Sequence, residues 1–236
     1  MSPTTSAVFS KPFSALLFDM DGTILNSLAS AERIWGNWAR RRGLDVETFL
    51  PTMHGVRGVD TIRRLALPGV DPEAEAAEIE REEIDDVEGI VAIAGAVAFL
   101  NSLPPQSWAI VTSAPLALAQ RRLEAAGIAV PRTMVTAEDV SVGKPNPECY
   151  LLGAEKLGVD IADCLVFEDA PAGIQAGEAA GAEVIVVTAT QVHAIATAHP
   201  TIASYDTIAA SVGTDGKISI VSRYGERDWA FRRSPG

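Results

Sequence analysis

Residues 14–23 read SALLFDMDGT, an apolar run that stops abruptly at two aspartates. The run has the composition of a buried β-strand, and Gly22 permits a tight reversal directly after it. Asp19 and Asp21 stand two positions apart, so their carboxylates leave the strand end on the same side. Such a pair is costly unless a cation offsets its charge, and oxygen ligands suit Mg²⁺. A plain strand-ending turn is the alternative, because Asp and Gly are also common in turns.

Three more apolar runs have the character of buried strands, and helical patterns separate them. The expected strands are residues 108–111, 164–167 and 183–188. The expected helices are residues 96–103, 115–126, 147–158 and 171–181. Continuous apolar strands that alternate with helices predict an α/β fold, a Rossmann-like, doubly wound parallel sheet covered on both faces. In such sheets ligands bind outside the carboxyl ends of the strands.

Residues 26–92 break this rhythm, because they contain no convincing strand. Their helical patterns cover residues 28–42, 59–67 and 72–88. We therefore expect a helical domain at residues 26–92, inserted into a discontinuous α/β core. That core comprises residues 1–25 and 93–236.

Polar residues also follow the second and third expected strands. Thr112 and Ser113 offer a hydroxyl and a backbone N–H to a phosphate oxygen, although capping of the next helix is the better explanation when this motif is taken alone. Glu168 and Asp169 form an acidic pair, although acids at a helix N-terminus are also dipole partners. Lys144 lies between glycine and proline in GKPNP, where it could balance phosphate charge or simply belong to a surface turn. It is not a P-loop lysine, because no Ser or Thr follows it.

The order of these four motifs resembles the haloacid dehalogenase-like superfamily over residues 14–220. That superfamily has a DxDGT loop, a Ser or Thr after the second strand, a downstream Lys and a terminal acidic pair. The segments HGVRGVDTIRRL, GKPNPECYLLGA and FEDAPAGIQAG resemble its sugar-phosphatase branch, which includes 2-deoxyglucose-6-phosphatases and bacterial broad-specificity hexitol and sugar phosphatases.

The resemblance implies a role for each motif residue. Asp19 is the expected nucleophile and Asp21 the general acid and base, with Thr23 helping to position Asp21. Mg²⁺ is the implied cofactor, and its expected ligands are the Asp19 carboxylate, the Asp21 main-chain carbonyl and the Asp169 carboxylate. Glu168 is expected to orient water on the metal. The expected phosphate-binding groups are Thr112, Ser113 and Lys144.

The position of the insert, between the first and second motifs, resembles that of a type 1 cap. Within it, HGVRG at residues 54–58 resembles a substrate-specificity loop, so His54 and Arg57 are candidates for substrate contact. A histidine with a structural role is the alternative for His54. Caps of this kind close over the site and exclude water.

Three functions remain open at this point. The favoured one is an Mg²⁺-dependent phosphatase that hydrolyses a small sugar or polyol phosphate. A β-phosphoglucomutase-like sugar phosphomutase shares nearly the same core motifs, and a mutase would need a sugar bisphosphate to sustain turnover. A non-enzymatic binding protein on the same fold is the third, although a decayed enzyme should have lost a catalytic group.

The amino-acid composition limits the kinds of partner that this protein is expected to bind. The 236 residues are 47% hydrophobic and carry a net charge of −12, which argues against nucleic acid as a partner. Residues 71–88 hold ten acidic residues and one arginine, the pattern of a solvated helix face. The N-terminus lacks a signal-peptide pattern, and residues 89–100 are too short an apolar run for a membrane span. We expect a monomeric cytoplasmic protein, and we assign no function to the tail at residues 223–236.

Overall fold

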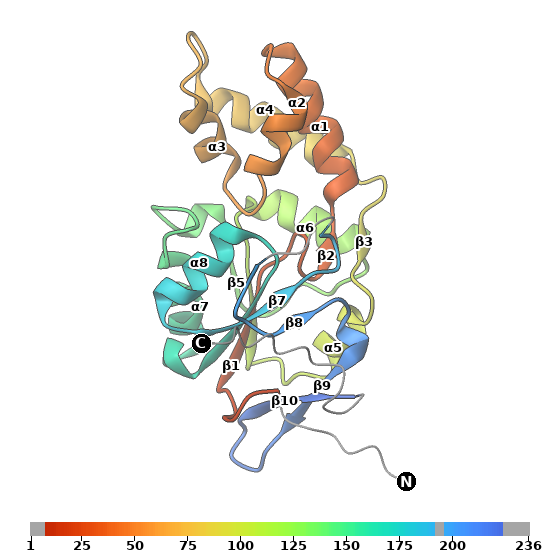
Figure 1. Ribbon diagram of the computed structural model, residues 1–236, viewed down its shortest axis with the longest axis vertical. Coiled ribbons are helices and arrows are strands. Elements are labelled where there is room, and N and C mark those ends of the chain that lie inside the picture. Colours follow the sequence, from red (N-terminus) through yellow and green to blue (C-terminus); the bar gives the residue numbers. More distant parts are fainter. Residues whose placement is uncertain (1–7, 192–195, 224–236) are drawn as a thin grey trace.

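The computed structural model describes residues 8–191 and 196–223 (Figure 1). Its main sheet has six parallel strands in the order β5-β4-β1-β6-β7-β8. The strands are β1 (Ala15–Phe18), β4 (Trp108–Val111), β5 (Met134–Val135), β6 (Cys164–Glu168), β7 (Glu183–Val187) and β8 (Thr201–Ile202). The fold class predicted from the sequence is confirmed.

Helices cover both faces of this sheet, because successive strand residues point to opposite sides. On one face, Leu16 and Phe18 join a core with α5 (Ala96–Asn101) and α6 (Leu116–Ala125). On the other face, Leu17 joins a separate core with α7 (Glu148–Leu157) and α8 (Pro171–Ala180). All four helices were predicted from their patterns, with ends that differ by one or two residues.

A third apolar core lies in the inserted segment, which stands above the carboxyl edge of the sheet in Figure 1. Its helices are α1 (Leu28–Arg41), α2 (Val46–Phe49), α3 (Gly58–Leu65) and α4 (Pro72–Asp85). Trp35, Trp38 and Phe49 pack their rings together at its centre. The short α2 was not predicted, since four residues carry too little periodicity.

Two short strands mark where the chain leaves the main sheet region and returns to it. β2 (Leu25–Asn26) pairs antiparallel with β3 (Val91–Ala92), with Leu25 opposite Ala92. The expectation that residues 26–92 contain no strand is therefore wrong at both ends of that range. Two-residue strands show no alternation, so only the pairing itself reveals them.

Beyond the sheet, β9 (Ile208–Val212) and β10 (Ile218–Ser222) form an antiparallel hairpin. Ile208, Ile218 and Ile220 of this hairpin extend the core on the α5 side of the sheet. These strands, with β5 and β8, were not predicted. The C-terminal tail lies outside the described residues apart from Arg223. No described helix is both long and apolar enough to span a bilayer.

Candidate active site

Strand register brings the predicted motifs together at one edge of the sheet. Phe18, the last residue of β1, pairs with Phe167 of β6 and Ile110 of β4. The residues that follow these pairs therefore lie side by side: Asp19, Glu168 and Val111, with Thr112 next. Each arrives at the edge from a strand that is buried on both faces, so the site is preorganised by the sheet.

Lys144 enters this edge from the loop before α7 and is buried there. Its ammonium donates to Oδ1 of Asp19 at 2.6 Å and to Oε1 of Glu168 at 2.7 Å. It also donates to the carbonyl oxygen of Val111 at 3.2 Å. The lysine is 3% exposed, which excludes an ordinary surface turn.

Glu168 is held by more partners than the sequence suggested. Its Oε1 accepts from Lys144 and from the Tyr150 hydroxyl at 2.7 Å, and its Oε2 accepts from the backbone N–H groups of Asp169 and Ala170. Both oxygens are thus engaged within the described residues. This arrangement makes Glu168 a group that orients Lys144. The expected role beside metal-bound water stays a prediction.

Asp169 lies on the other side of Asp19 and receives its hydrogen bond from Thr23. The Thr23 hydroxyl donates to Oδ1 of Asp169 at 3.1 Å, so the structure connects Thr23 to Asp169 and not to Asp21. Gly22 has a φ of +84°, and a Cβ added there would come within 2.0 Å of Oδ2 of Asp169. Glycine is therefore required at this position for both its backbone conformation and its size.

The charges at this edge suit a divalent cation. Oxygens of Asp19, Glu168 and Asp169 lie within 4.8 Å of one another, with Lys144 as the cation among them. Since hydrogen bonds between described residues occupy one oxygen each of Asp19 and Asp169, the second oxygen of each is available as a hard ligand. The residues present therefore fit a metal ion, and Glu168 is the least available of the three.

Burial and crowding change the proton affinities of these groups. Burial raises the pKa of Asp19 to about 7, with Glu168 adding to the rise and Lys144 opposing it. Burial, together with the charges of Asp19 and Glu168, also raises the pKa of Asp169. For Lys144 burial disfavours the charged form, but Asp19 and Glu168 outweigh it and raise the pKa of the ammonium.

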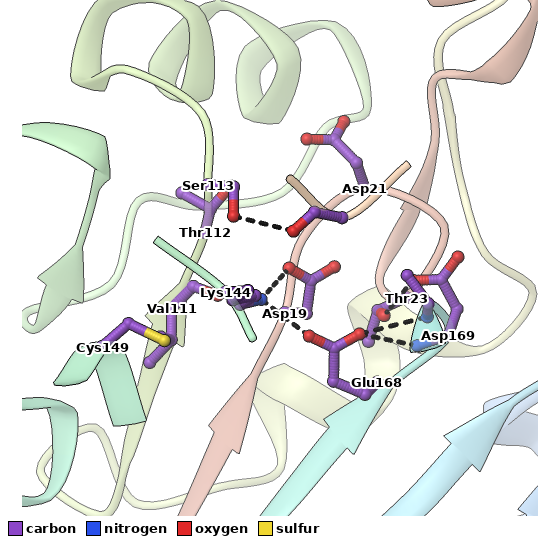
Figure 2. Close-up of polar contacts among 12 residues, drawn as sticks. Asp19, Asp21, Thr23, Val111, Thr112, Ser113, Lys144, Cys149, Glu168 and Asp169 are labelled. Atoms are coloured by element: carbon purple, nitrogen blue, oxygen red, sulfur yellow. Dashed lines mark hydrogen bonds and ion pairs between the residues drawn. The ribbon is translucent and has the colours of Figure 1, made fainter. Parts of the chain in front are cut away.

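Asp21 is turned away from Asp19, toward the inserted helices (Figure 2). Its Oδ1 accepts a hydrogen bond from the Ser27 hydroxyl at 2.6 Å. Its Oδ2 lies 3.0 Å from a terminal nitrogen of Arg122. The two carboxylates of the DMDGT motif thus point in different directions. Asp19 points toward Lys144, and Asp21 points toward Ser27 and Arg122.

Thr112 and Ser113 lie where they were predicted, at the end of β4 and beside Asp19 (Figure 2). The Thr112 hydroxyl accepts from the Ala114 N–H at 3.0 Å, so it shapes the turn that follows the strand. The Ser113 hydroxyl donates to the carbonyl oxygen of Gly55, a residue of the inserted segment, at 3.0 Å. Ser113 therefore connects the sheet edge to the inserted segment.

His54 and Arg57, the two candidates for substrate contact in the inserted segment, have different surroundings. His54 lines the cavity, and burial lowers the pKa of its imidazole against the opposing charges of Glu32 and Asp21. Arg57 also lines the cavity, but its guanidinium donates to Asp60 and to the carbonyl oxygens of Val140 and Ser141. These bonds favour docking of the insert onto the sheet domain over direct substrate contact by Arg57.

A cavity of about 540 Å³ lies between the sheet edge and the inserted helices. Asp19, Thr112 and Asp169 line it from the sheet, and Trp35 and Glu80 line it from the insert. This volume suits a small molecule. A molecule in it would touch both the carboxylates and the insert.

Several site residues were missed from the sequence. Arg122 and Glu83 are both buried, and they form an ion pair between α6 and α4 at 2.8 Å. A signal for them existed: Arg122 lies four residues after the buried Leu118, and Glu83 four residues after the buried Ile79, so both fall on inward helix faces. The solvated-face interpretation of residues 71–88 is wrong at Glu83.

The fold and the site define an α/β protein with a carboxylate cluster and a buried lysine at the carboxyl edge of a parallel sheet. A family model described as haloacid dehalogenase-like hydrolase matches residues 13–181. The chain belongs to this family, as the motifs had indicated.

Individual relatives give the same assignment. Hexitol phosphatase A of Escherichia coli (strain K12) is 45% identical over 177 residues, which cover 73% of this chain and 82% of that protein. Glycerol-1-phosphate phosphohydrolase 2 of Saccharomyces cerevisiae is 37% identical over 198 residues, which cover 79% of each chain. The structure of β-phosphoglucomutase from Clostridium difficile matches with a TM-score of 0.66 at 22% identity, over 74% of this chain and 84% of that one. At this identity the likeness to the mutase concerns the fold alone.

Proposed function

We propose that this chain is an Mg²⁺-dependent phosphomonoesterase that hydrolyses small sugar or polyol phosphates through an aspartyl-phosphate on Asp19. The observation that carries the proposal is the buried pairing of Asp19 with Lys144, beside Asp169 and beneath a cavity of small-molecule size. The names of the two sequence relatives, a hexitol phosphatase and a glycerol-1-phosphate phosphohydrolase, support the class of substrate.

In the first half-reaction, a carboxylate oxygen of Asp19 attacks phosphorus and the bond from phosphorus to the sugar oxygen breaks. The leaving oxygen takes a proton from Asp21. An in-line displacement would place that oxygen on the side of phosphorus remote from Asp19. Asp21 points away from Asp19 (Figure 2), as a proton donor on that side requires. Lys144 and the Ser113 N–H hold the phosphoryl oxygens.

In the second half-reaction, Asp21 is a carboxylate and removes a proton from water. The water oxygen attacks phosphorus, the bond to Asp19 breaks, and inorganic phosphate leaves with Asp19 restored as a carboxylate. Asp19, Asp169 and the main-chain carbonyl of Asp21 would hold the Mg²⁺ ion, which would offset negative charge on the phosphoryl group.

We also propose that residues 26–92 act as a cap on a core of residues 1–25 and 93–236. Two features support this division. The β2–β3 pair lies where the chain enters and leaves the insert, and the insert has a separate apolar core around Trp35 and Trp38. A monomeric cytoplasmic enzyme without nucleic-acid or membrane partners remains our prediction.

The test is release of inorganic phosphate from a panel of sugar, polyol and aryl monophosphates with Mg²⁺. We expect sustained turnover of sugar or polyol monophosphates without any bisphosphate, and none by the Asp19→Asn variant. Turnover that requires a catalytic amount of sugar bisphosphate, with isomerised sugar phosphate as the product, would favour the mutase. Absence of turnover on the whole panel would contradict the proposal.

A further inference from the structure

The guanidinium of Arg122 joins two acids that belong to different parts of the molecule. One terminal nitrogen lies 3.0 Å from Oδ2 of Asp21, in the loop after β1. The other lies 2.8 Å from Oε1 of Glu83, on α4 of the inserted segment. Arg122 itself lies on α6 of the sheet domain, so three separate segments meet at one side chain.

Two of the three side chains in this bridge are buried, and the third, Asp21, is 28% exposed. Arg122 is 5% exposed and Glu83 6% exposed. Desolvating such charges is costly, and a buried pair adds stability only where its geometry is good. The Nε atom of Arg122 also lacks a hydrogen-bond partner among the described residues. An apolar residue on this inward face would avoid these costs, so folding alone gives little reason for an arginine here.

Glu83 is in turn fixed by the inserted helices. Its Oε1 accepts a hydrogen bond from the Trp35 indole N–H at 3.2 Å, and Trp35 belongs to the aromatic core of α1. The carboxylate is therefore tied to both α1 and α4. If these helices move away from the sheet edge, Glu83 leaves Arg122 with them.

We propose that Arg122 is a positioning residue through which the closed cap holds Asp21 in place for proton transfer. Glu83 orients the guanidinium, and the guanidinium, with the Ser27 hydroxyl, orients the Asp21 carboxylate toward the leaving-group side of the cavity. The role in proton transfer rests on the proposed function of Asp21; the closure contact does not. When the cap is closed, Arg122 and Ser27 hold Asp21, and Glu83 holds Arg122. When the cap is open, Arg122 lacks Glu83 and constrains Asp21 less.

The kinetic test uses Glu83→Gln, with Glu82→Gln as the matched control. Glu82 neighbours Glu83 on α4 but pairs with Arg41 inside the insert. We expect Glu83→Gln to lower kcat for a sugar phosphate by about 10²-fold, because misplacing a catalytic group by about 1 Å costs that much. An aryl phosphate should lose far less, since its leaving group needs no proton, and Glu82→Gln should match the wild type on both substrates.

Making the Glu83→Gln change in an Asp21→Asn enzyme distinguishes a positioning role of Arg122 from direct contact between Arg122 and the substrate. In an Asp21→Asn enzyme, adding Glu83→Gln should change the rate of phosphoenzyme formation by less than about twofold, because Arg122 acts through Asp21. Equal losses in both backgrounds would overturn the proposal. Arg122→Lys should reproduce the loss while keeping a charge on the inward face, and urea unfolding of each variant identifies any folding defect.

A second readout does not depend on activity. Amide hydrogen exchange in α4 should be faster in Glu83→Gln and Arg122→Lys than in the wild type, and unchanged in Glu82→Gln. Unchanged exchange in the first two variants would overturn the closure contact. If the wild type releases phosphate from no monophosphate, the proposed function fails, whereas the exchange measurement still decides the role of the bridge.

Discussion

The Nζ atom of Lys144 lies 2.6 Å from Oδ1 of Asp19, and both side chains are buried. Between them the chain runs through the whole inserted segment, β4, α6 and β5. The pair gives the expected nucleophile a fixed direction, because one oxygen is committed to the lysine while the other is available. It also keeps a positive charge where the phosphoryl oxygens of a bound substrate would lie.

Replacing Lys144 with methionine removes that charge while keeping an unbranched side chain. We expect kcat/KM for any phosphomonoester to fall by about 10²–10³-fold, by analogy with the loss of one preorganised donor. Lys156→Met on α7, which removes an exposed lysine paired with Asp139, is the control and should be nearly neutral. Steady-state phosphate release measures both, and wild-type kinetics in Lys144→Met would remove the lysine from the site.

Gly173→Ala should disturb the site by displacing the Glu168 carboxylate, which lies against Gly173. A Cβ on Gly173 would lie 1.6 Å from Oε1 of Glu168, so Glu168 must move and Lys144 loses a partner. We expect a loss of about 1–3 kcal/mol in the free energy of unfolding, the usual cost of overpacking, together with reduced activity. Gly36→Ala, whose Cβ would come no closer than 3.7 Å to Val46, is the control. Urea unfolding compares them, and equal stabilities would show that Glu168 has room to relax.

Removing divalent cations should abolish phosphate release, because the single charge of Lys144 would then be left to offset Asp19, Glu168, Asp169 and the anionic substrate. Adding Mg²⁺ after chelation should restore it. Asp169→Asn should need a higher Mg²⁺ concentration for half-maximal activity, since it removes a charged ligand. Full activity in excess chelator would exclude the metal from the reaction.

Asp21→Asn separates the roles of the two aspartates. Loss of proton transfer costs about 10²–10⁴-fold, but the need for a proton depends on the leaving group. The variant should therefore form phosphoenzyme faster from an aryl phosphate than from a sugar phosphate. Phosphorus label should then accumulate on Asp19, because no base activates water. Rapid-quench labelling with peptide mapping tests this, and label on another residue would contradict the assignment.

His54 should make stability depend on pH. Burial lowers its pKa below the ordinary value of 6.5, so the unfolded chain binds a proton more readily than the native one. Above pH 6.5 the effect vanishes. Between pH 6.5 and the lowered native pKa, the free energy of unfolding falls by up to about 1.4 kcal/mol per pH unit as the pH falls, and below the native pKa it falls no further. His54→Gln should reduce this slope. Urea unfolding at pH 7.5 and 5.5 measures it, and equal slopes in both proteins would contradict the prediction.

The core of the fold and three members of its site could be predicted from residue order. Four apolar runs alternate with helices, and parallel strands end at the same edge of a sheet. Asp19, Thr112 and Asp169 therefore had to lie near one another once the sheet was assumed. Lys144 required the family resemblance, because a lysine in a loop has no periodicity that places it.

The remaining features depend on contacts between distant segments. Arg122 and Glu83 were recognisable as charges on inward helix faces, but 39 residues separate them, and nothing local states that they meet. The same holds for Glu168, whose motif suggested the metal while its actual partners, Lys144 and Tyr150, come from the loop before α7 and from α7 itself. Local patterns determine which way a side chain faces. Its partner is determined by the packing of helices onto the sheet and the insert, because desolvated charges must be paired there.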